Sequence, residues 1–138
     1  MPRDDAIKPA VVAALVKDGW TITADPLLLR YEEFGVGIDL GAERLLAAAR
    51  GRERIAVETK TFAGVSTVRE YRDAWGQYDI YRMVLEETQP DRKLYLAVTA
   101  DVHRDVFGLR AVQMFLRKRP MARIVVRTDT EEVVEWIG

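Results

Sequence analysis

The stretch that decides the fold of this chain is Arg54-Ile55-Ala56-Val57-Glu58-Thr59-Lys60. A short apolar run of this kind is typical of a buried strand, and here the strand becomes polar at its end. Because side chains alternate along a strand, Glu58 and Lys60 emerge on one face, whereas Val57 and Thr59 point the other way, into the core. A carboxylate and an ammonium at the end of an apolar strand indicate a candidate functional site.

A second carboxylate precedes this strand, in the glycine-bounded segment Gly35-Val36-Gly37-Ile38-Asp39-Leu40-Gly41. This segment is expected to form a short strand that brings Asp39 near Glu58. Mg²⁺ is usually held by one or two carboxylates, with water and substrate phosphate as further ligands. We therefore predict that Asp39 and Glu58 bind Mg²⁺ and that Lys60 orients or helps to deprotonate the attacking water. The alternative is an ordinary ion pair at a sheet edge, since such pairs are common on strands.

The residues between these two strands admit two interpretations. Residues 43–50 have a strong intrinsic helix propensity. Gly51-Arg52-Glu53 resembles a hairpin turn, however, and a hairpin would make residues 43–50 a strand paired with residues 54–60. The hairpin is favoured, and the choice between helix and strand determines how Asp39 approaches Glu58.

The rest of the chain alternates between helical and extended patterns, which predicts one domain, residues 1–138, with a mixed sheet flanked by helices. The first predicted helix is capped by Asp4 or Asp5 and tolerates Pro9 only in its first turn. The predicted helices span residues 4–18, 68–87 and 101–118, and further strands span residues 20–23, 93–99, 123–127 and 133–137.

Composition excludes several classes of function. The chain has no cysteine, which rules out disulfides and thiolate sites. A formal net charge of −1 gives no bulk electrostatic reason to bind nucleic acid, although a nuclease needs only a local basic rim. The acidic N-terminus differs from a signal peptide, and no apolar run is long enough to span a bilayer. We expect a cytoplasmic protein without membrane contact.

Asp39, a hairpin, Glu58-Thr59-Lys60 and a following helix together resemble the D…(D/E)-x-K core of the PD-(D/E)XK superfamily. The resemblance implies a restriction-endonuclease-like fold, a mixed β-sheet flanked by helices. Gln77 and Tyr81 on that helix match the Q-x-x-x-Y element of RecB-like members. Their four-residue spacing puts both on one helical face, where they can contact DNA or support the metal centre. Plain packing beside Trp75 is the alternative.

The match narrows to one family, because six blocks along nearly the whole chain resemble XisH, the fdxN element excision controlling factor family found chiefly in cyanobacteria. These blocks are Lys17–Thr23, Ile38–Glu43, Ile55–Phe62, Gly76-Gln77, Tyr81-Arg82 and Leu94–Val98. The resemblance implies an endonuclease-like fold and, with an XisI-like partner, control of the excision of a DNA element.

One departure from the family pattern concerns the first helix, where members carry a glutamate that faces the metal. The corresponding position here is Pro9, and Asp4 or Asp5, about one turn away, is the alternative source of the acid. Two hypotheses follow: a Mg²⁺-dependent DNA endonuclease, as a homodimer if it cuts both strands, or a nuclease-like accessory factor of weak or absent activity that binds DNA or protein. A defence-type nuclease with a small partner is a third reading.

Other candidates have simpler explanations. His103, the one histidine, is expected to be a solvated surface residue. Arg117-Lys118-Arg119 complements a helix dipole. Arg50, Arg52 and Arg54 crowd the hairpin tip, where solvation is at least as good an explanation as phosphate contact. Tyr71, Trp75 and Tyr78 are assigned to the core.

Overall fold

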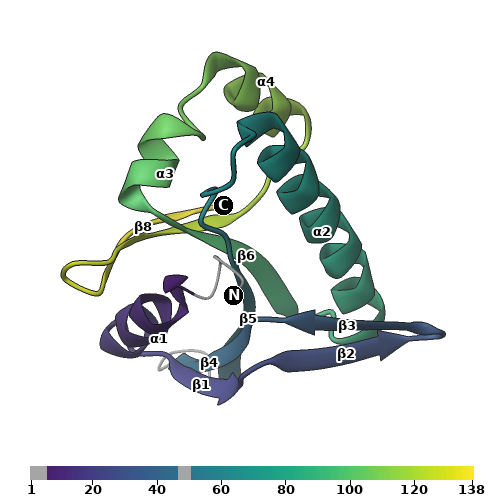
Figure 1. Ribbon diagram of the computed structural model, residues 1–138. Coiled ribbons are helices and arrows are strands. Elements are labelled where there is room, and N and C mark those ends of the chain that lie inside the picture. The colour runs from purple at the N-terminus through teal and green to yellow at the C-terminus, as the bar shows by residue number, and fades with distance from the viewer. Residues whose placement is uncertain (1–5, 47–50) are drawn as a thin grey trace.

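The computed structural model describes residues 6–46 and 51–138, which form an α/β fold (Figure 1). Its elements, in chain order, are α1 (Lys8–Lys17), β1 (Thr21–Ala24), β2 (Leu27–Tyr31), β3 (Phe34–Ile38), β4 (Leu40–Leu46), β5 (Gly51–Thr59), α2 (Thr67–Thr88), β6 (Arg92–Thr99), α3 (Ala100–Asp105), α4 (Arg110–Lys118), β7 (Arg123–Arg127) and β8 (Glu132–Ile137).

The main sheet has six strands in the order β1-β4-β5-β6-β7-β8. The pairs β5–β6 and β6–β7 are parallel, and the other three pairs are antiparallel. The helix α2 makes the crossover between β5 and β6, as parallel neighbours require. The mixed sheet flanked by helices that the sequence predicts is therefore confirmed at the level of its architecture.

Each face of this sheet has its own apolar core. One face packs against α1, whose Val11, Ala14 and Leu15 are fully buried with Val57 and other strand residues. The opposite face packs against α2, the α3–α4 region and the hairpin formed by β2 and β3. The central strands β5 and β6 are buried on both faces, which explains their nearly continuous apolar sequences.

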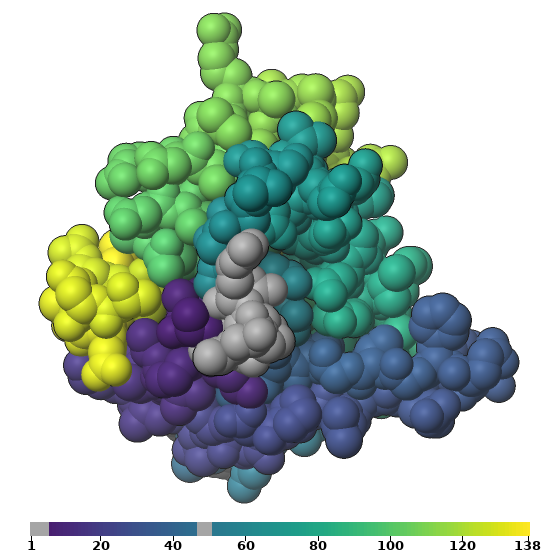
Figure 2. All heavy atoms as spheres, viewed as in Figure 1, coloured from purple at the N-terminus to yellow at the C-terminus, as the bar shows by residue number. Residues whose placement is uncertain are grey.

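The β2–β3 hairpin, which the sequence analysis did not predict as a unit, forms a separate two-stranded sheet. Leu27, Leu29 and Ile38 are buried in the core shared with α2. Figures 1 and 2 show the hairpin extending away from the main sheet, past one end of α2. Tertiary packing thus supports a strand pair that the helix propensity of leucine and the two glycines of β3 would disfavour.

The first helix is shorter than predicted. It begins at Lys8, after Ile7 as N-cap without a side-chain capping bond, and Pro9 lies in its first turn, as its missing N–H requires. The predicted caps, Asp4 and Asp5, lie outside the described residues. Gly19 follows the helix with φ +93°, a conformation that glycine adopts without steric cost and that confirms the predicted stop.

The two interpretations of residues 43–50 are resolved in favour of the hairpin, because β4 pairs with β5 from Leu40↔Val57 to Leu46↔Gly51. The predicted position of the turn is wrong, since Gly51-Arg52-Glu53 belongs to β5. Residues 47–50 themselves lie outside the described part of the chain. β-sheet hydrogen bonds and cross-strand ion pairs therefore outweigh the local helix propensity of this segment.

The single helix predicted for residues 101–118 is wrong, since the chain forms two helices, α3 and α4. Thr99, and not Asp101, caps α3, with its hydroxyl accepting from the Val102 N–H over 3.2 Å. The break buries Phe107 completely, and a Cβ at Gly108 would collide with the Arg104 carbonyl.

Within residues 6–46 and 51–138, no helix is both long and apolar enough to cross a membrane.

Candidate functional site

Asp39 occupies the single position between the hairpin and the main sheet. Ile38 ends β3 and is buried in the core on the α2 side, whereas Leu40 begins β4 and is buried on the α1 side. The chain therefore passes from one face of the main sheet to the other at Asp39. Because Leu40 pairs with Val57, Asp39 lies beside the end of β5. The half-buried Asp39 consequently meets Glu58 and Thr59, although nearly 20 residues of sequence separate them.

Asp39 is fixed by hydrogen bonds in both directions. Its backbone N–H donates to Glu58 Oε1 over 3.1 Å. Its Oδ2 accepts from the Thr59 backbone N–H over 2.9 Å and from the Thr59 hydroxyl over 2.6 Å. The Oδ1 atom takes part in none of these three bonds. The two carboxylates are thus held next to each other at the polar end of β5.

Lys60 completes the group that the sequence singled out. Its ammonium lies 3.9 Å from Glu58 Oε2, and the two side chains are only 15% and 12% exposed. The backbone N–H of Lys60 donates to Ala97 O over 3.1 Å, which ties the end of β5 to the parallel strand β6. The structure therefore brings together Asp39, Glu58 and Lys60, in a location shielded from most of the solvent.

Tyr81 reaches the same location from α2. Burial raises the pKa of its hydroxyl above the ordinary value, and the negative charges of Glu58 and Asp39 raise it further. Gln77 lies one turn earlier on the same helix, and its Oε1 atom is buried without a hydrogen-bond partner in the described part of the chain. Tyr81 therefore lies within the electrostatic influence of the two carboxylates, whereas the buried Gln77 Oε1 binds neither of them.

The donor set is compatible with Mg²⁺. Asp39 and Glu58 offer carboxylate oxygens, which hard cations prefer. Among the described residues, however, no group of three or more acidic, histidine or cysteine side chains could hold a metal ion. A Mg²⁺ ion here would be held by the two carboxylates, with the remaining ligands from water and substrate phosphate. Pro9, at the position where relatives are expected to carry an acid, adds no oxygen ligand from its side chain.

Thr59 is the residue of this site that sequence reasoning missed. Its alternation with Glu58 and Lys60 assigned it to the core, and it is indeed 0% exposed. Yet its hydroxyl and its N–H both bind Asp39. The signal that could have identified it is a hydroxyl in an otherwise apolar buried strand, because a buried polar group needs a partner.

Several weaker candidates are also placed by the structure. His103 lies at the surface but is only 33% exposed: its Nδ1 is buried without a partner among the described residues, and its Nε2 lies 3.8 Å from Glu135. Trp75 is 36% exposed, so its assignment to the core is wrong, whereas Tyr71 and Tyr78 are buried as predicted. At the β4–β5 hairpin, Arg52 and Arg54 both pair with Glu43.

Fold and site together define a class of protein: an α/β domain with two carboxylates and a lysine at the end of a central strand. The family model described as XisH protein matches residues 1–134. The chain belongs to the XisH family. No functionally curated protein matches it.

Two crystal structures are similar to this chain over nearly their full length. One is an XisH family protein from Nostoc punctiforme, with 33% identity, a TM-score of 0.85, and coverage of 94% of this chain and 97% of that chain. The other is described as a fdxN element excision controlling factor protein from Anabaena variabilis, with 32% identity, a TM-score of 0.87, and coverage of 97% and 99%. The predicted family is therefore confirmed.

Proposed function

We propose that this protein controls the excision of a DNA element by site-specific recombination and that it acts as a Mg²⁺-dependent DNA endonuclease of the PD-(D/E)XK type. The first part extends to this chain the role named for its Anabaena variabilis relative. The second part depends on one observation, the convergence of Asp39, Glu58 and Lys60 at the end of β5.

The order of elements around the site supports the PD-(D/E)XK assignment. A helix, an antiparallel strand pair that leads into Glu58-Thr59-Lys60, a crossover helix and a parallel strand occur in this order as α1, β4–β5, α2 and β6, with β1 and the β2–β3 hairpin between α1 and β4. The acidic residue before the hairpin and the E-x-K sequence at its end occupy the positions that the superfamily pattern requires. These features support the proposed reaction class, hydrolysis of a phosphodiester bond.

Each residue has a distinct role in this proposal. Asp39 and Glu58 would hold the ion, with Thr59 fixing the orientation of Asp39 through Oδ2. Bound Mg²⁺ would neutralise charge on the scissile phosphate and assist the attack of water. Lys60, held near Glu58, would orient that water or stabilise the developing charge. Tyr81 and Gln77 would contact the DNA or support the site from α2.

The proposal also implies partners. DNA is the substrate, and an XisI-like protein is the expected partner in excision control. Because cutting both strands of a duplex often requires two active sites, a homodimer is part of the endonuclease proposal.

A second function is favoured by one specific observation. Pro9, in the first turn of α1, replaces the first-helix acid that the family pattern includes. This substitution favours a nuclease-like accessory factor that binds DNA or an XisI-like protein with little or no catalysis. The same three residues would then remain as a structural ion-pair cluster.

The test is a cleavage assay on supercoiled, linear and branched DNA with Mg²⁺ or Mn²⁺. Wild-type protein is compared with Glu58→Gln and Lys60→Met, which remove one charged group each and nearly preserve side-chain volume. Glu53→Gln is the matched control, since Glu53 lies on the same strand and pairs with Arg44 at 2.9 Å, far along β5 from the site.

We expect cleavage by wild-type protein and by the Glu53 variant, and a loss of at least about 100-fold in the other two, the size typical of a missing acid–base or electrostatic group. Cleavage that survives both site substitutions would remove this site from the reaction. No cleavage on any substrate, together with retained DNA binding by gel shift, would select the accessory function. Titration calorimetry with Mn²⁺ checks the ion site separately.

A further inference from the structure

A second charged group is buried on the strand β7, where Arg123 lies two strands from Glu58 in the sheet register. Arg123 is only 7% exposed, and it sits between Leu96 on β6 and Ile137 on β8 in the sheet register. Its guanidinium carbon lies 4.9 Å from the ring centroid of the fully buried Phe107. The ring of Phe107 covers one face of the guanidinium, so that a hydrogen-bonding group can reach the guanidinium only at its edge.

That edge has no partner in the part of the chain that the structure describes. Arg123 forms no hydrogen bond or ion pair with residues 6–46 or 51–138, and its Nε atom is buried. Burial lowers the pKa of Arg123 from the ordinary value, and the electrostatic influence of Tyr71, Glu135 and Tyr78 counteracts only part of this shift. A buried charge without a counter-charge is strongly unfavourable, since arginine stays protonated in proteins.

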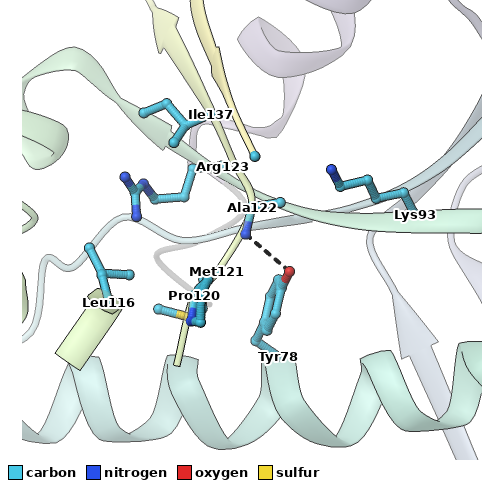
Figure 3. Close-up of a pocket in the computed structure, with 9 residues that line it drawn as sticks. Tyr78, Lys93, Leu116, Pro120, Met121, Ala122, Arg123 and Ile137 are labelled. Atoms are coloured by element: carbon cyan, nitrogen blue, oxygen red, sulfur yellow. Dashed lines mark hydrogen bonds between the residues drawn. The ribbon is translucent and has the colours of Figure 1, made fainter. Parts of the chain in front are cut away.

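A groove with a volume of about 340 Å³ adjoins this arginine. The two lining side chains that carry a charge, Arg123 and Lys93, are both cations, and Gly138 lines the groove through its backbone. Figure 3 shows Arg123 beside Leu116 and Ile137 on one side of the groove and Lys93 on the other side. Most of the remaining wall is apolar and includes Leu116, Pro120, Met121 and Ile137.

We propose that this groove is a binding site for an organic anion, whose carboxylate or phosphate group pairs with the guanidinium of Arg123. The planar donor edge of arginine binds two oxygens of such a group side by side. The apolar wall suits the hydrocarbon part of the ligand, and Lys93 adds positive potential at the rim. The lining residues of the groove do not include Asp39, Glu58 or Lys60, and the proposal does not depend on the function of that cluster.

The test uses inorganic phosphate and hexanoate as probes, each compared with chloride at equal ionic strength. Binding is measured by titration calorimetry and by the shift in thermal midpoint, on wild-type protein and on Arg123→Met. Arg127→Met is the matched control, because Arg127 ends the same strand and is exposed. Tighter binding of hexanoate assigns the site to carboxylates with an apolar body, and tighter binding of phosphate assigns it to phosphorylated ligands.

We expect wild type and Arg127→Met to bind at least one probe, and Arg123→Met to bind at least about tenfold more weakly, as loss of a charge-assisted hydrogen bond implies. In chloride, Arg123→Met should unfold at the same temperature as wild type or higher, because it loses an unpaired buried charge. Equal binding by Arg123→Met, or no binding of either probe by wild type, would overturn the proposal.

A titration that needs no variant covers the case in which Arg123→Met does not fold. The backbone amide signals of Met121 and Ala122, which line the groove, are followed by NMR in wild-type protein. Saturable shifts of these signals with phosphate or hexanoate support the site. Signals that stay unchanged with both probes contradict it.

Discussion

The Thr59 hydroxyl donates a 2.6 Å hydrogen bond to Asp39 Oδ2, the same oxygen that accepts the Thr59 backbone N–H over 2.9 Å. Two donors of Thr59 therefore fix the carboxylate of Asp39, which is the carboxylate of the site that does not lie on β5. The arrangement orients Asp39 before any ligand arrives. Proteins commonly fix the geometry of a metal-binding side chain through the residues that form hydrogen bonds with it.

Thr59→Val should weaken this orientation with little change in shape, since valine replaces the hydroxyl with a methyl group. Under the proposed function we expect Mn²⁺ affinity to fall about tenfold, the lower end for loss of a group that orients a metal ligand. Thr59→Ser, which keeps the hydroxyl, should retain most of the affinity. Titration calorimetry measures both. Equal affinity in the valine and serine variants would show that the backbone N–H alone suffices.

Arg92 and Arg82 provide a contrast between a buried and an exposed arginine. Arg92 is 6% exposed and donates to Ile55 O over 2.7 Å and to Gln89 Oε1 over 2.8 Å. We expect Arg92→Ala to lower the free energy of unfolding by about 2 to 3 kcal/mol, because two acceptors lose their donor and one of them is a strand carbonyl. Urea denaturation checks this value.

The control is Arg82→Ala. Arg82 also binds two partners, Asp79 and Glu86, at 2.6 and 2.8 Å, but its side chain is 47% exposed. Exposed ion pairs contribute little, so this change should cost less than about 1 kcal/mol. A larger loss in Arg82→Ala than in Arg92→Ala would contradict the assigned difference.

Tyr78 and Tyr71 lie two turns apart on α2 and differ in how their hydroxyls are satisfied. Tyr78 accepts from the Ala122 N–H over 3.0 Å and donates to Leu94 O over 3.4 Å, whereas the buried Tyr71 hydroxyl has no partner in the described chain. Tyr78→Phe should therefore destabilise by about 1 to 2 kcal/mol, and Tyr71→Phe should be neutral or stabilising. Urea denaturation of both variants makes the comparison, and equal losses would refute it.

The same two tyrosines predict how stability depends on alkaline pH. Burial raises the pKa of both hydroxyls above their ordinary value. The folded state thus retains protons that the unfolded state releases near pH 10, so unfolding free energy should fall as pH rises from about 10 through the folded-state pKa values. Each tyrosine contributes at most about 1.4 kcal/mol per pH unit.

Unfolding free energies at several pH values above 9 measure this loss, and the double variant Tyr71→Phe, Tyr78→Phe isolates it from lysine titration. We expect a shallower decline in the double variant. A parallel decline in wild type and double variant would mean that other groups cause the effect.

Much of the fold could be predicted from local patterns. The strands β5, β6 and β7 and the helix α2 follow from apolar runs and helical periodicity, which depend on neighbouring residues only. The break between α3 and α4 could not be predicted in this way, because residues 101–118 have a helical pattern throughout. It is the burial of Phe107 against the rest of the fold that interrupts the helix.

The candidate site, like the fold, could be predicted from the sequence only in part. The sequence by itself determined that Glu58 and Lys60 share a face, since strand geometry has a period of two, and its blocks determined the family. Only the tertiary structure decided that Asp39 meets Thr59, that Arg123 is buried beside a groove, and that β2 and β3 pair beneath α2. The physical reason is that these contacts join residues distant in sequence, whose side chains meet only when the sheet and its helices have packed.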